Sequence, residues 1–223
     1  MLYSVSDGPI IQKNLVSGNP TVSPTRMNSL PRLVVATRNA HKTAEIRSML
    51  GGRFEVVDAT AFPDFPEIEE TGTTFLENAR LKAEGISRLI DGWVLSDDSG
   101  LEVDALDGAP GVWSSSFGGE EGNNAKNNAR LMTEMTGRTD RTARFRCTMV
   151  IARDGTERAH FNGTVEGTVI DAPRGGAGFG YDPLFIPEGY EHTFSELGDD
   201  VKNTLSHRSR ALAQVTDWLE VNF

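Results

Sequence analysis

Cysteine, long apolar runs and positive charge are all in short supply in this sequence, and each shortage excludes a class of protein. The single cysteine, Cys147, has no second thiol in the chain, which excludes an internal disulfide and favours a reducing compartment such as the cytoplasm. No run of about 18 apolar residues occurs, so no membrane span is predicted. The remaining composition, 38% hydrophobic and 24% charged over 223 residues, is typical of a globular domain with a real core.

Acidic residues outnumber basic ones, 32 to 22, and the net charge is −10. Nonspecific binding to nucleic acid depends on Lys and Arg side chains that neutralise phosphates, so no nucleic-acid partner is predicted. If the ligand is an anion, positive charge must be gathered locally or supplied by a metal ion.

Residues 1–30 contain Pro, Ser, Gly and Asn without sustained periodicity. They lack the basic segment and the long apolar segment of a secretory signal. We expect a flexible extension, or sequence upstream of a true start at Met27, and place the folded domain at residues 31–223.

From residue 31 onward, helical and strand patterns alternate. Apolar spacing predicts helices over 39–50, 73–90 and 123–137, and a further helix carrying the stripe 201–219. Strands are predicted over 32–37, 53–59, 93–106 (with a polar interruption), 142–170 (a hairpin turning at Asp154 and Gly155) and 183–186. This order indicates an α/β fold in which helices flank a mixed central β-sheet.

The turn "TRNAHK" at 37–42 joins the first strand to the first helix. Backbone N–H groups at such a turn, the helix dipole and the Lys42 ammonium together suit an anion. An ordinary N-cap with a surface lysine explains the same residues, and for this turn alone it is the better interpretation.

Carboxylates gather in two places. "SDDSG" puts Asp97 and Asp98 on a strand, where alternation sends them to opposite faces. "PEIEETG" offers Glu67, Glu69 and Glu70 just before the long second helix. Carboxylates from two separate segments suit Mg²⁺, which takes oxygen ligands and keeps several waters, whereas each segment alone is more often a solvated acidic loop.

A glycine-rich segment, "RGGAGFGYDP" at 174–183, carries Phe179 between two glycines. A planar ligand could stack on this ring while backbone amides and Asp182 bind its edge. A plain glycine-rich loop is the alternative.

Arg208 occupies the apolar stripe of the last predicted helix, where the pattern requires a hydrophobic residue. A buried guanidinium needs a phosphate or carboxylate partner, so Arg208 either binds an anionic ligand or pairs with an acid across the fold. His207 beside it can donate or accept a hydrogen bond, and Lys202 lies one to two turns upstream. Taken together, the four segments favour a site for a small, phosphorylated, ring-bearing molecule with a metal ion.

Five segments of the chain occur in the order of a known family: "ATRNAHKTAEI", "EETGTTFLENARLKA", "SDDSGLEVDALDGAPGVWSS", "GFGYDPLFIPEGY" and "KNTLSHRSRAL". From about residue 32 to its end the chain resembles the inosine/xanthosine triphosphate pyrophosphatases, which remove non-canonical purine nucleotides. The resemblance implies two lobes around a substrate cleft, usually in a homodimer. It implies hydrolysis of ITP, dITP and XTP to the monophosphate and pyrophosphate with Mg²⁺.

Residue roles follow from the same resemblance. Asp98 would be the catalytic proton acceptor and a metal ligand, and Glu70 the second metal ligand, with Glu67 and Glu69 close enough to compete for that place. The substrate-binding residues would be Thr37, Arg38, Asn39, Ala40, His41, Lys42, Ser99, Phe179, Gly180, Tyr181, Asp182, Lys202, His207 and Arg208.

The chain departs from the family pattern at three serines. Ser115 and Ser116 stand where the family often has Ala and Arg, and Ser96 where it usually has Ala. Two other functions compete with the leading one: a non-catalytic nucleotide sensor, which should have lost the carboxylates present here, and a pyrophosphatase with a different base preference.

Overall fold

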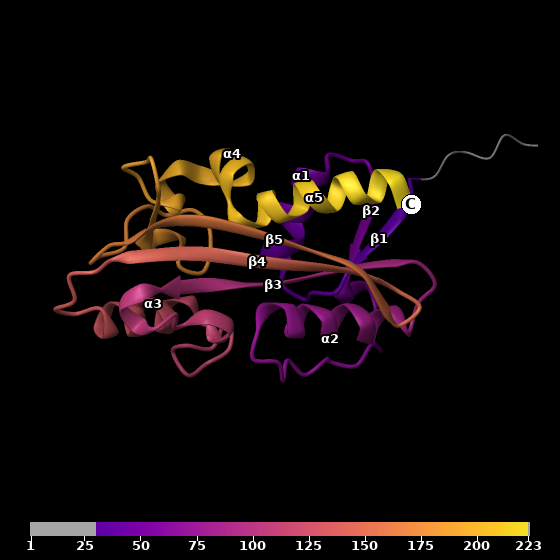
Figure 1. Ribbon diagram of the computed structural model, residues 1–223, viewed down its shortest axis with the longest axis horizontal. Helices are drawn as coiled ribbons and strands as arrows, with labels where there is room; N and C mark the ends of the chain where they lie inside the picture. Colours follow the sequence, from indigo (N-terminus) through magenta and orange to yellow (C-terminus); the bar gives the residue numbers. More distant parts are fainter. Residues whose placement is uncertain (1–29, 223) are drawn as a thin grey trace, which may run out of the picture.

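The computed structural model describes residues 30–222 (Figure 1). The extension predicted for residues 1–30 lies outside this part of the chain, apart from Leu30. The described chain forms five helices, α1 (Ala40–Leu50), α2 (Phe75–Ser87), α3 (Asn124–Glu134), α4 (Phe194–Leu205) and α5 (His207–Asn222). It forms the strands β1 (Arg32–Val35), β2 (Glu55–Asp58), β3 (Trp93–Val103), β4 (Thr142–Arg153), β5 (Thr156–Val169) and β6 (Phe185–Pro187).

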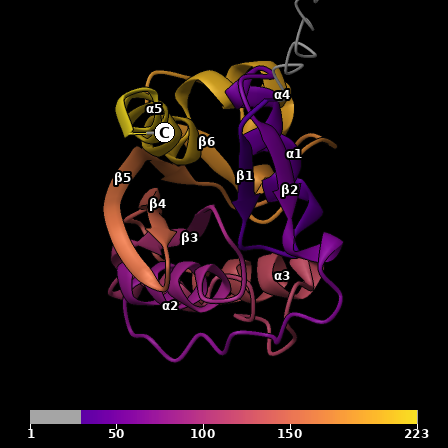
Figure 2. The same ribbon diagram turned by 90° about the vertical axis from the view of Figure 1, so that its right-hand side faces the viewer.

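The strands form one mixed sheet in the order β2-β1-β3-β4-β5-β6, which confirms the predicted fold class. β1 runs parallel to β2 and β3, and the pairs from β3 to β6 are antiparallel. α1, α4 and α5 lie on one side of the sheet, and α2 and α3 lie on the other (Figures 1 and 2). No helix within residues 30–222 is long and apolar enough to cross a bilayer.

Two hydrophobic cores share the long strands. The first core packs α1 and α5 against the sheet through residues such as Leu33, Ile46, Leu95, Met149 and Leu212. The second core lies at the other end of the long strands and includes Leu101, Phe145, Leu184, Phe185 and Phe194. On β3 the two cores are separated by a polar segment, residues 96–99. Polar groups are therefore buried at the junction between two apolar cores.

β3 is one continuous strand, so the predicted interruption at its polar segment is wrong. Asp97 pairs with Met149 and Asp98 with Thr148 across the β3–β4 ladder. Polar side chains do not break a strand whose backbone hydrogen bonds are complete. The predicted alternation is confirmed, because Asp97 faces Arg208 of α5 whereas Asp98 faces Lys82 of α2.

The C-terminal stripe is divided between two helices rather than carried by one, which corrects the predicted helix. The chain leaves helical geometry at Ser206 (φ −68°, ψ 164°), whose hydroxyl oxygen accepts from the Ser209 amide in the first turn of α5. Leu205 packs against the second core, whereas Leu212 belongs to the first. Arg208 lies between these two leucines in the sequence and belongs to neither apolar core.

Other local predictions are confirmed. Thr74 and Glu77 form the capping box at the start of α2. The β4–β5 hairpin turns at Asp154 (φ 54°) and Gly155 (φ 74°), the left-handed geometry that an Asp-Gly turn supplies.

Candidate active site

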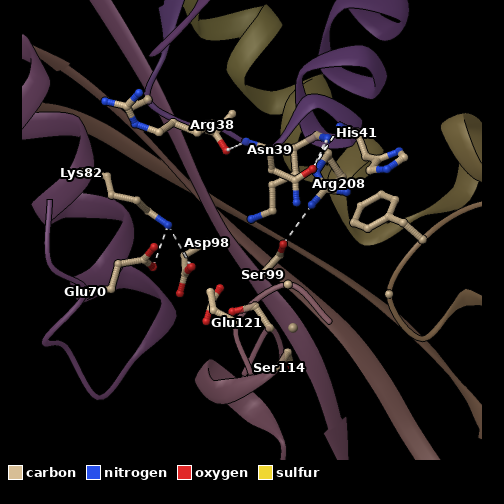
Figure 3. Close-up of a pocket in the computed structure, with 18 of the residues that line it drawn as sticks. Arg38, Asn39, His41, Glu70, Lys82, Asp98, Ser99, Ser114, Glu121 and Arg208 are labelled. Carbon is tan, nitrogen blue, oxygen red and sulfur yellow. Dashed lines mark hydrogen bonds and ion pairs between the residues drawn. The ribbon is translucent and has the colours of Figure 1, made fainter. Parts of the chain in front are cut away.

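A cavity of about 440 Å³ opens where the two cores meet. Its walls come from the β1–α1 turn, the loop before α2, the middle of β3, the glycine-rich segment and the start of α5. All but one of the predicted site residues line it: Thr37, Arg38, Asn39, His41, Lys42, Glu70, Asp98, Ser99, Phe179, Gly180, Tyr181, Asp182, Lys202, His207 and Arg208. Ala40 is not among the lining residues. Residues more than 150 positions apart are thus gathered around one cavity (Figure 3).

The β1–α1 turn is both an N-cap and a wall of the cavity, so its two interpretations are compatible. The Asn39 side-chain oxygen accepts from the amides of His41 (3.0 Å) and Lys42 (3.3 Å). The Lys42 ammonium lies 3.0 Å from a carboxylate oxygen of Asp97. The Arg38 guanidinium donates to the carbonyl oxygen of Phe65 (2.9 Å), in the loop that leads to α2.

Asp98 and Glu70 form the acidic end of the cavity. Lys82, from α2, donates to Glu70 Oε2 (2.8 Å) and to Asp98 Oδ1 (3.0 Å) (Figure 3). Burial raises the pKa of Asp98 to about 6 even though Lys82 acts in the opposite direction. The second oxygen, Asp98 Oδ2, is buried without a hydrogen-bond partner among the described residues. Glu67 also lines the cavity, whereas Glu69 does not.

These carboxylates fit a divalent cation of the Mg²⁺ kind. Within residues 30–222, no three acidic, His or Cys side chains converge as a ready-made metal cage. Mg²⁺ does not need one, since it is commonly bound by one or two carboxylates with waters and substrate phosphates. Asp98 and Glu70 already converge on the positive charge of Lys82. Asp98 Oδ2 is an acceptor without a hydrogen-bond partner among the described residues.

Arg208 is paired with acids across the fold, as one of the two sequence interpretations predicts, and it also lines the cavity. Its side chain is 1% exposed. It donates to Glu45 Oε2 (2.5 Å), to Asp97 Oδ2 (2.9 Å) and to the Ser99 hydroxyl (2.9 Å). Burial alone would raise the pKa of Asp97, but Lys42 and Arg208 hold it well below its usual range. Asp97 is therefore a fixed anion that orients two cations of the cavity.

Phe179 is placed by its own loop and surrounded by cations. Asp182 Oδ2 accepts from the Phe179 amide (2.9 Å) and from Lys202 (2.6 Å). The Lys202 ammonium lies 4.4 Å from the centre of the Phe179 ring. His41 stacks on the same ring at 5.2 Å. The ring is held by polar contacts at its backbone, so one wall of the cavity is an aromatic surface with positive charge beside it.

His207 is buried and neutral. It stacks on Phe145 at 4.8 Å, and its Nδ1 has no hydrogen-bond partner among the described residues. Burial, reinforced by the positive charges of Arg208 and Lys202, holds the pKa of His207 well below its usual value. A neutral imidazole in the wall can offer a ligand either a donor or an acceptor.

Several residues of the site carry no clear signal in the sequence. Lys82 lies within a confirmed helix, but helical spacing alone does not indicate that its ammonium reaches Asp98. Glu45 lies on α1 as an ordinary polar position, yet it is buried between Lys202 and Arg208. Glu121, in the segment before α3, and Asn124, the first residue of α3, also line the cavity. A buried Arg208 required a buried carboxylate, and that need was the one available signal for Glu45.

Of the three unusual serines, Ser96 makes a hydrogen bond through its hydroxyl, whereas Ser115 contributes a cavity wall and its backbone carbonyl. Ser115 lines the cavity, and its carbonyl oxygen accepts from the side chain of Asn127 (2.9 Å). The Ser96 hydroxyl donates to the Ala79 carbonyl oxygen of α2 (2.5 Å), which ties that helix to β3. Nothing in the structure explains Ser116.

Both the sequence and the fold match a known protein family. The model of the Ham1 family matches residues 33–218. The chain belongs to the Ham1 family. A relative from Geobacter sulfurreducens is 47% identical over 193 residues, covering 85% of this chain and 97% of the relative, and one from an Exiguobacterium species is 48% identical over 185 residues, covering 82% and 94%. Both are named dITP/XTP pyrophosphatases.

Solved structures of the Ham1 family share the fold. The Ham1 protein of Staphylococcus aureus aligns with a TM-score of 0.77 at 35% identity, covering 86% of this chain and all of that one. A HAM1 protein from Coxiella burnetii aligns with the same TM-score and identity, covering 85% of this chain and 98% of that chain.

Proposed function

We propose that the protein hydrolyses the non-canonical purine nucleotides ITP, dITP and XTP to the nucleoside monophosphate and pyrophosphate. The observation that carries the proposal is that a single cavity has two chemically different ends. A carboxylate with a free oxygen, Asp98, lies at one end, and an aromatic ring flanked by cations, Phe179, lies at the other. The names of the Ham1 relatives supply the substrate class.

The triphosphate binds along the β1–α1 turn. Arg38 and Lys42 line this wall of the cavity, and the start of α1 contributes its dipole. Water attacks the α-phosphorus, the anhydride bond to the β-phosphate breaks, and pyrophosphate leaves. Asp98 accepts the proton of the attacking water, since it lines the cavity and its Oδ2 has no hydrogen-bond partner among the described residues.

The catalytic metal is proposed to be Mg²⁺, held by Asp98 and Glu70. Bound there, Mg²⁺ neutralises the negative charge that develops on the phosphoryl oxygens. This charge also allows an acidic protein to bind a triphosphate, together with the cationic side chains of the cavity. Lys42, Lys82 and Arg208 each keep an acid beside them, so their charge is already placed before the substrate arrives.

The base stacks on Phe179, and the groups around the ring select it. Lys202, His207 and Arg208 place hydrogen-bond donors near this ring, which suits the 6-oxo group of hypoxanthine and xanthine. Adenine carries an amino donor at the same position. A donor facing a donor leaves a buried group unsatisfied, which disfavours adenine by roughly 1–3 kcal/mol for each such group.

The decisive experiment is pyrophosphate release from ITP, dITP, XTP, dATP and GTP at equal concentration, first with Mg²⁺ and then with EDTA. We expect metal-dependent release, mainly from ITP, dITP and XTP. If the protein binds ITP but releases pyrophosphate from none of these nucleotides, it is a nucleotide sensor and not an enzyme.

The proposal includes the setting in which the enzyme works. A nucleotide is its only predicted partner besides a second copy of the chain, since the resemblance implies a homodimer and the net charge of −10 disfavours nucleic acid. The buried thiol of Cys147 supports a cytoplasmic location. Light scattering of the purified protein tests the dimer.

A further inference from the structure

The Lys82 ammonium forms ion pairs with the carboxylates of both Asp98 and Glu70. It lies 2.8 Å from Glu70 Oε2 and 3.0 Å from Asp98 Oδ1, and the Lys82 side chain is 13% exposed. Asp98 is on β3, Glu70 is in the loop before α2, and Lys82 is on α2 itself. A single positive charge thus joins two carboxylates from separate segments.

The other cations that line the cavity form their ion pairs with different carboxylates. Lys42 pairs with Asp97, Lys202 with Glu45 and Asp182, and Arg208 with Glu45 and Asp97. Among the residues that the structure describes, Lys82 is therefore the cation that forms an ion pair with both Asp98 and Glu70.

We propose that Lys82 is a placeholder for the divalent cation and that metal and nucleotide bind cooperatively for this reason. A metal ion between Asp98 and Glu70 would lie against the ammonium, and two cations repel each other strongly in a site with little water. Lys82 must therefore leave the carboxylates as the metal arrives. Without a new partner its charge would stay poorly solvated, so metal binding to the nucleotide-free protein is weak.

A phosphate group supplies the new partner. Lys82 lines the same cavity as the β1–α1 turn, where the triphosphate is proposed to bind. When a phosphate accepts the ammonium, Asp98 and Glu70 are released for the metal. Lys82 is in this sense a positioning residue that links the occupancy of one site to that of the other. The coupling rests on the proposed function, whereas the competition between Lys82 and the metal requires only the proposed metal site at Asp98 and Glu70.

The test is Mn²⁺ binding to the nucleotide-free protein, measured by electron paramagnetic resonance of the free ion. Lys82→Met keeps the apolar stem and removes the charge, and it should bind Mn²⁺ about tenfold more tightly than the wild type or better. Lys82→Arg keeps the charge and should bind as weakly as the wild type. Lys126→Met makes the same change of charge at an exposed pair with Glu120, outside the cavity lining, and should alter the affinity little.

Two outcomes would overturn the proposal. One is Mn²⁺ affinity in Lys82→Met no higher than in the wild type. The other is an equal gain in Lys126→Met, since the effect would then come from net charge alone. Lys82→Gln provides a second neutral variant in case the first folds poorly.

Thermal unfolding gives a readout that works even for a destabilised variant. Mn²⁺ should raise the melting temperature of Lys82→Met and Lys82→Gln by more than it raises that of the wild type, because a tighter ligand stabilises the folded state more. Equal increases would contradict the proposal. Wild-type turnover of ITP is measured separately, so a failure of the proposed function leaves the metal result interpretable.

Discussion

Asp97 and Asp98 are neighbours in the chain, but the fold gives them different tasks. Asp97 is buried and forms ion pairs with Lys42 and Arg208. Loss of its negative charge would therefore leave both cations without this partner. Asp98 faces the cavity with one oxygen unpaired and a pKa raised to about 6. Strand alternation is the cause, since adjacent side chains of β3 must face opposite sides of the sheet.

Asp98→Asn should remove the proton acceptor while keeping the size and shape of the side chain. We expect kcat for ITP to fall about 100-fold or more, whereas the dissociation constant of ITP measured without a divalent cation should change far less. Steady-state kinetics and calorimetric titration measure the two quantities. A variant that retains most of its turnover would show that Asp98 is not the base.

Arg208→Met should destabilise the protein, because it leaves the buried carboxylates of Asp97 and Glu45 without their shared partner. Breaking one side of a buried ion pair typically reduces the free energy of unfolding by about 3–5 kcal/mol. Urea unfolding measures the loss. Arg53→Met is the control, since the exposed pair between Arg53 and Glu220 should contribute less than about 1 kcal/mol. Equal losses in both variants would refute the buried network.

At the scale of the elements, sequence patterns predicted what depends on neighbouring residues. The capping box of α2 and the Asp154–Gly155 turn are local, and both were confirmed. The break at Ser206 was not predicted, because the apolar spacing continues across it while the two halves pack on different cores. Its cause is tertiary, and a pattern along one helix does not contain it.

The residues of the cavity also divide into those that the sequence indicates and contacts that only the fold shows. Motifs placed Asp98, Phe179 and Arg208 correctly around one cavity. They did not indicate that Lys82 bridges Asp98 and Glu70, because that contact depends on how α2 lies across β3. Which residues line the cavity could be predicted from the sequence, whereas which of them neutralise one another required the fold.

Gly163 on β5 lets the start of α5 approach the sheet. A Cβ added there would lie 2.0 Å from the His207 carbonyl oxygen and 2.7 Å from the Ala211 amide nitrogen. Gly163→Ala should therefore push α5 outward and lower the free energy of unfolding by about 1–3 kcal/mol, the usual effect of overpacking. Gly176→Ala, with nothing within 4 Å of its added Cβ, should change stability little in the same urea titration. A stable Gly163→Ala would mean that the helix can shift freely.

At the scale of the whole molecule, the cavity exists because two cores share three long strands without merging. β3, β4 and β5 run through both, and the polar middle of β3 separates them. Charged side chains can be buried there in pairs without displacing apolar packing. As a consequence, the site contains many groups whose protonation differs between the folded and unfolded chain. The free energy of unfolding must therefore depend on pH.

His207 makes one part of that dependence predictable. Its pKa is well below the usual value in the folded protein, chiefly because of burial, and is about 6.5 in the unfolded chain. Below pH 6.5 the unfolded chain therefore binds a proton that the folded protein does not, so stability is lost as the pH falls. Between pH 7.5 and 5.5 this loss is about 1.4 kcal/mol for one such group.

His207→Gln isolates this contribution, because all other titrating groups are common to both proteins. Urea unfolding at several pH values should show the wild type losing about 1.4 kcal/mol more than His207→Gln between pH 7.5 and 5.5. Above pH 7.5 the two stability curves should run parallel, since the imidazole is then neutral in both states. Curves that stay parallel down to pH 5.5 would mean that His207 takes up a proton inside the folded protein. The cluster of Arg208 and Lys202 would then not act on it as a repelling charge.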